Sequence, residues 1–329
     1  SQCARSTLLH NEFFVCYQRC SITDFLRVMH AIVIKSTGSW YKLLLDDGQV
    51  VDARLRGKIR TLELKTTNPV VVGDDVLLDF VEKEYNIREV QDRKNCIVRK
   101  SNKLSKQFQI IAANIDHAFL IISPAKPHTP QGFIDRFLAT AEAYSIPVSL
   151  LLNKSDLDTR KANNHRELLM SIYPTIGYKI DNVSFLNEED IETIKDQVAD
   201  KCILLAGNSG VGKSTLINAL LPESNQKVGA VSTSYEKGKH TTTFAQMFLG
   251  ENGCRVIDTP GIKDFGMVNM EPNQVSHYFP EMRDLLHFCK FSNCLHTEEP
   301  ECNVLQAVES GEISASRYVS YLGILEELS

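Results

Sequence analysis

The stretch Gly207-Asn208-Ser209-Gly210-Val211-Gly212-Lys213-Ser214 decides how this chain folds. It matches G-x-x-x-x-G-K-[ST], the loop that wraps phosphate groups between a buried strand and a helix. The apolar run 202–206 before it predicts the strand, and residues 215–221 after it predict a helix that stops before a proline. A glycine-rich turn ahead of an ordinary helix is the alternative, which this flanking context disfavours.

Each residue of this loop has an expected contact with a nucleotide. Glycines let the backbone curl so that its N–H groups face phosphate oxygens at the positive end of a helix. Lys213 is expected to reach the β- and γ-phosphates, and the Ser214 hydroxyl to take one position on Mg²⁺. The predicted phosphate-binding set is Gly207, Asn208, Ser209, Gly210, Val211, Gly212, Lys213, Ser214 and Thr215.

A second motif, Asn153-Lys154-Ser155-Asp156, ends another apolar run. The carboxyl end of a parallel strand is where an open α/β sheet binds its ligand. The Asp156 carboxylate can accept hydrogen bonds from N1–H and the 2-amino group of guanine, which adenine does not offer. Asn153 can bond the other edge of the base, and the Lys154 stem can lie along its plane. Together with the phosphate loop, this motif favours GTP over ATP.

The run Asn182-Val183-Ser184 follows a further expected strand. Ser184 is a candidate for an additional contact to the base. A plain turn at the end of the strand is an equally good interpretation.

The stretch Asp258-Thr259-Pro260-Gly261 follows the second strand of an expected hairpin. Asp258 is expected to hold Mg²⁺ through water, and the Gly261 N–H to meet the γ-phosphate. Thr242, in a run of three threonines, can add its hydroxyl to Mg²⁺. The predicted catalytic group is Lys213, Thr242, Asp258 and Gly261; the predicted magnesium ligands are Ser214, Thr242 and Asp258.

Ile262 stands where many GTPases place a water-orienting Gln. An isoleucine cannot orient water, so we expect slow intrinsic hydrolysis until a partner completes the site. His240 is a possible substitute, although a solvent-facing histidine in a loop is the simpler interpretation.

The order of the motifs is transposed. The base motif precedes the phosphate loop, whereas in an ordinary GTPase it follows both the phosphate loop and D-x-x-G. A βα sheet can be cut at one loop and rejoined at another. The sequence therefore predicts an α/β fold with a circularly permuted GTPase domain over 108–272.

Residues 29–98 are expected to form a small barrel of the oligonucleotide-binding type, because short strand-like runs alternate with turn signals. Arg54, Arg56, Lys58 and Arg60 alternate along the chain, so on a strand they share one face that could follow a nucleic-acid backbone. A solvated barrel wall is an equal alternative. Residues 99–107 are expected to link the barrel to the next domain.

Four possible metal ligands lie near the end of the chain in the pattern C-x4-C-x-H-x5-C: Cys289, Cys294, His296 and Cys302. Three thiolates and one imidazole suit a closed, structural Zn²⁺ site. We expect a helical zinc domain over 273–329, with His287 as a rival ligand outside the compact spacing.

The whole chain has 329 residues, which is enough for two or three domains. Its nine cysteines are an odd number and show no disulfide framework, so a reducing cytoplasm is the expected compartment. The net charge of −5 is uneven: residues 30–110 carry a balance of +4 and residues 111–329 a balance of −10. Residues 1–28 have no clear periodicity, and we expect them to be an extension or expression remnant before a domain that begins near Met29.

This combination and order of motifs resembles the ribosome small-subunit-dependent GTPase family RsgA, also called YjeQ, over about 30–329. The segment 113–116 and the pair Asp135-Arg136 are also similar to that family's pattern. The resemblance implies a cytoplasmic GTP hydrolase that acts late in small-subunit assembly. The sequence carries no signal for the oligomeric state, so a monomer is the default expectation. It also implies that the barrel and the zinc domain bind rRNA and that the subunit stimulates hydrolysis.

Two other functions are consistent with parts of the sequence. A GTP-dependent small-molecule kinase would need a substrate pocket with a catalytic base. The sequence offers no candidate beyond the segment 227–243, which is rich in Gly, Ser and Lys and is expected to act as a switch loop. A GTP-controlled RNA-binding module with negligible hydrolysis would explain Ile262 directly.

Overall fold

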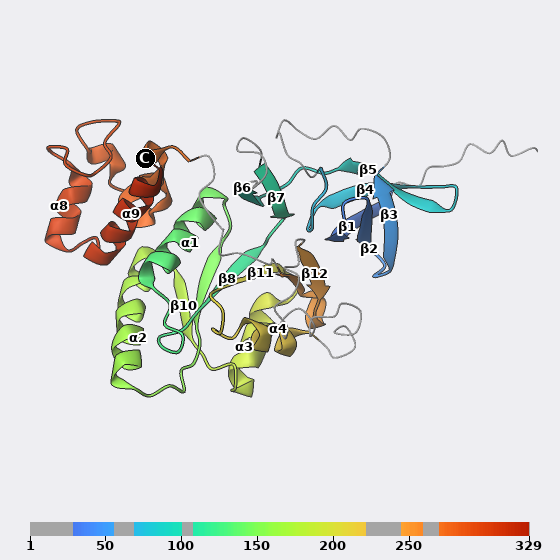
Figure 1. Ribbon diagram of the computed structural model, residues 1–329, viewed down its shortest axis with the longest axis horizontal. Coiled ribbons are helices and arrows are strands. Elements are labelled where there is room, and N and C mark those ends of the chain that lie inside the picture. The colour runs from blue at the N-terminus through green and yellow to red at the C-terminus, as the bar shows by residue number, and fades with distance from the viewer. Residues whose placement is uncertain (1–28, 56–68, 101–107, 222–244, 259–269, 329) are drawn as a thin grey trace, which may run out of the picture.

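The computed structural model describes residues 29–55, 69–100, 108–221, 245–258 and 270–328. A barrel, a central α/β layer and a helical C-terminal domain follow one another across the molecule (Figure 1). The barrel strands are β1 (Met29–Ser36), β2 (Trp40–Leu45), β3 (Val50–Leu55), β4 (Asp75–Val81) and β5 (Glu84–Val90). The remaining strands are β6 (Cys96–Lys100), β7 (Phe108–Ala113), β8 (His117–Ile122), β9 (Val148–Leu152), β10 (Lys179–Asn182), β11 (Cys202–Ala206), β12 (Gln246–Leu249) and β13 (Arg255–Asp258).

The helices of the described residues cover the sheet and build the C-terminal domain. The α-helices are α1 (Gln131–Ala143), α2 (Arg160–Ile172), α3 (Glu188–Val198), α4 (Lys213–Leu220), α7 (Pro280–Arg283), α8 (Asn303–Ser310) and α9 (Ala315–Leu328). Short 3-10 turns are η1 (Pro174–Ile176), η2 (Glu251–Gly253), η4 (Pro272–Tyr278) and η5 (Leu286–Phe288). No described helix is long and apolar enough to cross a membrane.

The first five strands close into a barrel in the order β1-β2-β3-β5-β4, with β4 returning to pair with β1. Alternate side chains such as Val33, Leu43 and Leu78 point inward and are completely buried, as the pleat requires. The predicted barrel is therefore confirmed. The apolar run 70–72 also predicts a strand, and this prediction is wrong: the segment is a buried loop in which only Val72 makes an isolated bridge, to Ala112.

A two-stranded antiparallel sheet, β6 with β7, lies between the barrel and the α/β layer. These two strands were not expected: β6 lies within the basic segment 92–107, whose composition favours a linker, whereas β7 (Phe-Gln-Ile-Ile-Ala-Ala) is largely apolar. Val71, Ile110 and Ala113 form a small buried cluster that connects this sheet to the barrel loop 70–72. The chain therefore enters the GTPase layer along a paired strand.

The sheet that contains the barrel strands continues into the central layer. Its strands there have the order β10-β9-β8-β11-β13-β12 and are parallel except for β12. Residues of β8 alternate between two cores. Leu120 and Ile122 pack with residues of α1, whereas Phe119 and Ile121 pack with residues of α3 and α4. Helices cover both faces of β8, β9 and β11, which is why these strands are nearly continuous apolar runs. The predicted permuted α/β architecture is confirmed, and β1 joins the barrel to it by pairing with β12.

Helix α9 packs the C-terminal domain against α1. A buried arginine stabilises this contact. Arg317 is 1% exposed and donates to Asp135 of α1 at 2.8 Å and to Glu281 at 2.7 Å. Tyr173 also donates to Asp135, at 2.7 Å. The sequence also predicts a helix over 274–287, but this segment consists of the 3-10 turn η4, the one-turn helix α7 and the start of η5.

Candidate functional site

The base motif and the phosphate loop meet at the carboxyl edge of the parallel sheet. β9 ends at Leu152 and β11 ends at Ala206, so both loops emerge on the same side. Asn153 joins them directly: its amide nitrogen donates to the Val211 carbonyl at 2.8 Å, and its amide oxygen accepts from the Phe185 N–H at 3.0 Å. One buried side chain therefore ties together segments 58 and 32 residues away.

Two glycines of the phosphate loop are required by close approach. Gly207 has φ of +141°, and a Cβ there would lie 2.4 Å from the Ile121 carbonyl oxygen. Gly212 has φ of +113°, and a Cβ there would lie 2.4 Å from the Asn153 amide nitrogen. An L side chain at either position would be strained and would collide with its neighbour. The loop therefore keeps its curl and its contact with the base motif.

The loop lysine lies over the curled backbone. Lys213 Nζ donates to the carbonyls of Gly207 at 2.5 Å and of Asn208 at 2.8 Å. Burial raises the pKa of Asp258, and the nearby charge of Lys213 opposes that rise. The end of β13 thus brings a carboxylate close to the ammonium. Ser214 and Thr215 lie in the first turn of α4, which begins at Lys213.

The base motif is oriented by the neighbouring strand end. The Ser184 hydroxyl donates to Asp156 Oδ1 at 3.1 Å. Ser184 is in turn fixed by its backbone N–H, which donates to Asp190 at 2.7 Å. Asp156 itself is exposed, so its carboxylate is held in place and still accessible to a ligand. Ser184 therefore lies close to the base motif and is positioned to orient Asp156.

Two supports of the site were missed by sequence reasoning. The loop 123–130 lies against the phosphate loop: Pro127 is 3.4 Å from where a Cβ on Gly210 would be, and Lys154 Nζ donates to the Lys126 carbonyl. Arg166 of α2 donates to the carbonyls of Ser155 at 3.3 Å and Leu157 at 3.2 Å. Neither has a sequence signal, because both act through backbone atoms brought close only by folding.

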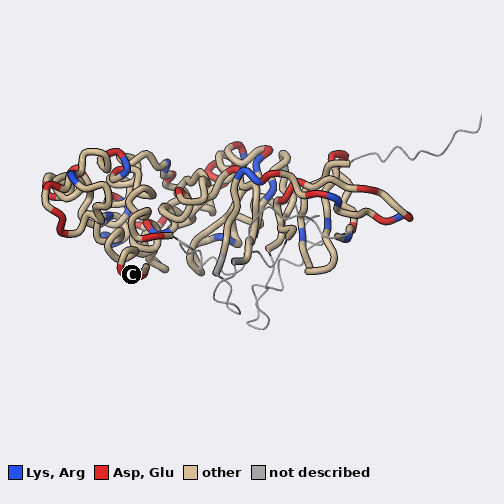
Figure 2. The backbone as a smooth tube through the Cα atoms, turned by 90° about the horizontal axis from the view of Figure 1, so that it is seen from above, with Lys and Arg blue, Asp and Glu red and all other residues tan. Residues whose placement is uncertain are grey.

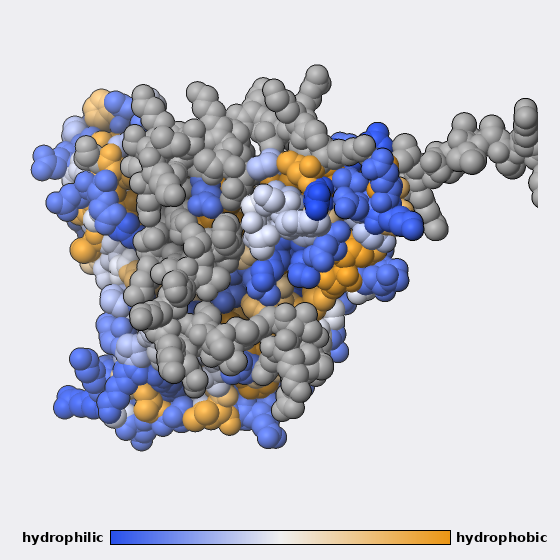
Figure 3. Space-filling view, turned by 45° about the vertical axis from the view of Figure 1, so that its right-hand side comes forward, coloured by the Kyte–Doolittle hydropathy of each residue, from blue (hydrophilic) through white to orange (hydrophobic). Residues whose placement is uncertain are grey.

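Some predicted residues lie outside the described residues: Thr242, Gly261, Ile262, His240, Arg56, Lys58, Arg60 and residues 1–28. Their roles stay predictions. Of the basic barrel residues, Arg54 is described: it is exposed, and its guanidinium lies 3.9 Å from the ring centroid of Trp40, which is 43% exposed. Figure 3, turned to bring the barrel end forward, shows hydrophilic and hydrophobic residues mixed over this face.

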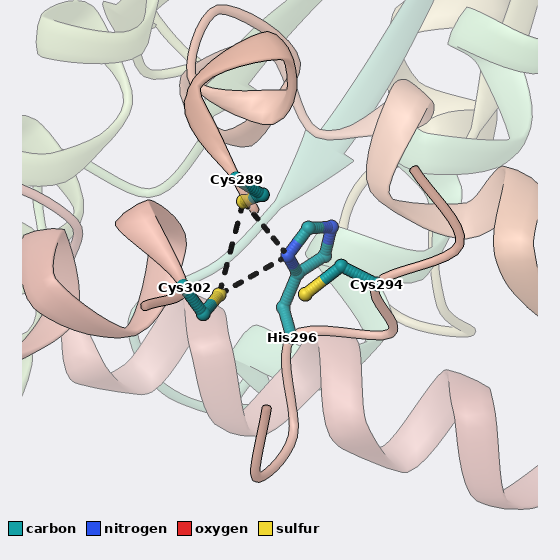
Figure 4. Close-up of side chains that lie close together, drawn as sticks. All are labelled: Cys289, Cys294, His296 and Cys302. Carbon is teal, nitrogen blue, oxygen red and sulfur yellow. Dashed lines mark hydrogen bonds between the residues drawn. The ribbon is translucent and has the colours of Figure 1, made fainter. Parts of the chain in front are cut away.

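The four predicted metal ligands converge in the C-terminal domain (Figure 4). Their ligand atoms lie within 4.8 Å of one another. Cys289 follows η5 and Cys302 caps α8, while Cys294 and His296 come from the loop between them. His287 is not part of this group; its ring lies against Phe288 at 3.9 Å.

The spacing of these atoms fits a tetrahedral zinc ion. Zn–S bonds of about 2.3 Å and Zn–N bonds of about 2.0 Å place two sulfurs about 3.8 Å apart and a sulfur and a nitrogen about 3.6 Å apart. Cys289 Sγ lies 3.9 Å from Cys302 Sγ and 3.7 Å from His296 Nδ1, and His296 Nδ1 lies 3.3 Å from Cys302 Sγ. Burial raises the pKa of Cys294 to about 12, a shift that a bound cation reverses. The donor set and its dimensions therefore suit a divalent ion.

Three side chains fix the loop that carries two of the ligands: Tyr318, Tyr321 and Glu299. Tyr318 and Tyr321 of α9 donate to the carbonyls of His296 and Leu295, each at 2.7 Å. Although burial opposes it, hydrogen bonds from the backbone N–H groups of residues 295, 297 and 298 lower the pKa of Glu299 to about 2. The ligand loop is thus held in place by α9 and by its own carboxylate.

Two family models match this chain. The RsgA GTPase model covers residues 90–268, and the RsgA N-terminal domain model covers residues 31–86. Among curated relatives, the small ribosomal subunit biogenesis GTPase RsgA of Phocaeicola vulgatus is 46% identical over 301 residues, which are 91% of this chain and 97% of that protein. The small ribosomal subunit biogenesis GTPase RsgA 2 of Bacteroides thetaiotaomicron is 46% identical over 300 residues, with the same coverage.

Two solved structures share the fold over most of the chain. YjeQ from Thermotoga maritima superposes with a TM-score of 0.74 at 32% identity, over 92% of this chain and 98% of that one. YloQ, described as a circularly permuted GTPase, superposes with a TM-score of 0.72 at 28% identity, over 92% of this chain and 95% of that one.

Proposed function

This chain belongs to the RsgA family of GTPases, and we propose that it hydrolyses GTP as a late maturation factor of the small ribosomal subunit. The subunit stimulates this hydrolysis, and the barrel contacts rRNA. The observation that carries the proposal is the hydrogen bond from Asn153 to Val211, because it supports one guanine-nucleotide site built from transposed motifs. A cytoplasmic monomer is part of the same proposal.

Each residue of the proposed site has a chemical task. Asp156, oriented by Ser184, accepts from the guanine edge, and Asn153 and Lys154 support the base. Loop residues 207–215 surround the phosphates, with Lys213 reaching the β- and γ-phosphates. Ser214, Asp258 and Thr242 hold Mg²⁺, which neutralises charge on the phosphates when bound. The Gly261 N–H meets the γ-phosphate.

Zinc is the proposed resident of the C-terminal cluster, held by Cys289, Cys294, His296 and Cys302. With all four positions taken by side chains, the ion has a structural task and takes no part in hydrolysis.

The test is GTP turnover of the full chain with and without purified small ribosomal subunits. Turnover should rise by about 10-fold or more with subunits, because a partner must complete a site that lacks a water-orienting Gln. Lys213→Ala is the control and should remove both the basal and the stimulated rate. A rise only with a small metabolite would favour the kinase alternative. Binding without any turnover would favour the RNA-binding module.

A further inference from the structure

Two adjacent residues of α2, His165 and Arg166, lie against the two loops that frame the proposed nucleotide site. Arg166 contacts the loop of the base motif, residues 153–157. His165 contacts loop 123–130, which lies against the phosphate loop. One helix therefore supports both the base end and the phosphate end of the site.

The backbone of the base motif needs support. Lys154 has φ of +70°, in the left-handed region that residues other than glycine seldom adopt. Arg166 Nη2 donates to the carbonyls of Ser155 at 3.3 Å and Leu157 at 3.2 Å, and it also reaches the carbonyl of residue 154 at 3.5 Å. Asn163 accepts from Arg166 Nη1 at 2.6 Å and so fixes the guanidinium from its other side. A planar fork with several donors fits these acceptors, whereas a single ammonium would not.

Loop 123–130 is closed at its base and reaches the phosphate loop at its tip. The Thr129 N–H donates to the Ser123 carbonyl at 3.0 Å. The Ser123 N–H donates to the Thr129 hydroxyl, also at 3.0 Å. At the tip, Pro127 lies 3.4 Å from where a Cβ on Gly210 would be. A shift of the tip would therefore be felt by the phosphate loop.

Two histidine rings join this loop to α2. The ring centroids of His128 and His165 lie 4.3 Å apart, with 42° between the ring planes. His165 is half-buried, and its Nε2 is buried without a hydrogen-bond partner in the described part of the chain. This contact suits a neutral imidazole, because a charged one would bury an N–H without an acceptor beside a second imidazole.

The surroundings of His165 oppose its protonation. Burial lowers the pKa of His165 most, and the like charges of His128 on the loop and Lys161 on α2 lower it further, whereas a backbone hydrogen bond at Thr129 opposes them. Acidic and basic residues are interspersed along the described chain (Figure 2), so close neighbours rather than a broad field of one sign act on this ring. The contact is therefore stable above about pH 6.5 and weakens as the pH falls below that value.

We propose that α2 positions the nucleotide site: Arg166 sets the base motif, and neutral His165 holds loop 123–130 against the phosphate loop. Both are positioning residues, because they act through the loops. Protonation of His165 moves the loop away from α2, so this chain binds guanine nucleotides less tightly in mild acid. This inference rests on the proposed function, since it concerns the same GTP site.

The pH dependence of nucleotide affinity tests the histidine. Affinity for a fluorescently labelled GDP, measured at about pH 7.5 and about pH 5.5, should fall about threefold more in the parent chain than in His165→Gln. Comparing the chains at the same pH cancels protonation of the nucleotide itself. His117→Gln is the matched control and should keep the parent's pH dependence. His117 is also half-buried with a pKa lowered by burial, but it begins β8 at the opposite edge of the sheet.

His128→Gln is a second variant, at an exposed position, which tests the same contact without altering α2. It removes one of the two like charges that lower the pKa of His165, so the loss of affinity should begin at a higher pH than in the parent chain. The same pH dependence in the parent, His165→Gln and His128→Gln would overturn the inference.

The ratio of GTP affinity to ATP affinity tests the arginine. Arg166→Met should lower this ratio by about tenfold, because the base loop loses its support while the phosphate loop keeps its own. Arg166→Lys keeps one donor and should recover part of the ratio. Arg160→Met, at an exposed arginine in the first turn of α2, is the control and should leave the ratio unchanged.

An unchanged ratio in Arg166→Met would overturn the inference while the proposed function stands. A parent chain that shows no preference for guanine nucleotides would instead overturn the proposed function, and this inference with it.

Discussion

The barrel and the C-terminal domain lie on opposite sides of the GTPase layer and differ in both charge and construction (Figure 1). The barrel region 30–110 has a balance of +4, and residues 270–329 have a balance of −7. The barrel core is a closed set of apolar side chains. The C-terminal core contains two of the candidate metal ligands, Cys294 and Cys302, and it also includes Ala139 of α1. A closed sheet buries its own core, whereas the acidic domain packs on its neighbour and, in our proposal, also requires a metal ion.

The largest expected difference follows from loss of the metal. Cys302→Ser should remove most of the metal's contribution to folding of residues 270–328, which for structural zinc is about 10 kcal/mol. The barrel should stay folded. The chain has a single tryptophan, Trp40 in the barrel, so its fluorescence reports the barrel, while limited proteolysis reports the C-terminal domain.

Cys96→Ser is the control, because Cys96 lies in β6 away from the cluster. Loss of the Trp40 signal together with proteolysis of the C-terminal domain would show that the two ends are not independent.

A smaller effect is expected at the buried contact with α1. Arg317→Met should destabilise the docked C-terminal domain by about 3–5 kcal/mol, because Asp135 and Glu281 lose their buried cation. Urea unfolding monitored by proteolysis of residues 270–328 measures it. Arg283→Met, at an exposed pair with Glu142, should cost about 1 kcal/mol or less. Equal effects of the two variants would contradict the assignment of the contact to Arg317.

The smallest expected effect is a change in RNA affinity, which should differ between a variant in the barrel and a variant in the C-terminal domain. Arg54→Gln should weaken binding of the chain to small-subunit rRNA by about threefold and lower the salt dependence, because one cation beside Trp40 is lost. Lys290→Gln should change neither, since its charge is paired within an acidic domain. Filter binding at several salt concentrations measures both. A larger loss for Lys290→Gln would reverse the comparison.

Much of the fold could be predicted because its signals are local. The alternating pattern predicts strands over Trp40–Leu45 and Val50–Leu55, and β2 and β3 have these same bounds. The order of the motifs was enough to predict the permutation, and the spacing of four ligands was enough to predict their convergence. β6 was missed because it lies inside the basic segment 92–107, which favours a linker, and β7 because, among the described strands, it pairs only with β6. Their pairing is decided by the chain on either side.

The supports of the site could not be predicted, because they are long-range contacts to backbone atoms. Arg166 binds carbonyls of the base loop, and Pro127 approaches Gly210, without any motif at either position. The interdomain role of Arg317 was invisible for another reason. An arginine in an amphipathic helix normally faces solvent, and only packing of α9 on α1 buries it.

The most direct test of the account is a competition experiment with the parent chain and with Asp156→Asn. It measures how well GTP, ATP and XTP displace a fluorescently labelled GDP. The parent should prefer GTP over ATP by about 100-fold or more, because Asp156 pairs with groups that adenine lacks. Asp156→Asn should lose GTP affinity and gain XTP affinity. A parent chain that binds ATP as tightly as GTP, or a variant with unchanged guanine preference, would contradict a single guanine site formed by these transposed motifs.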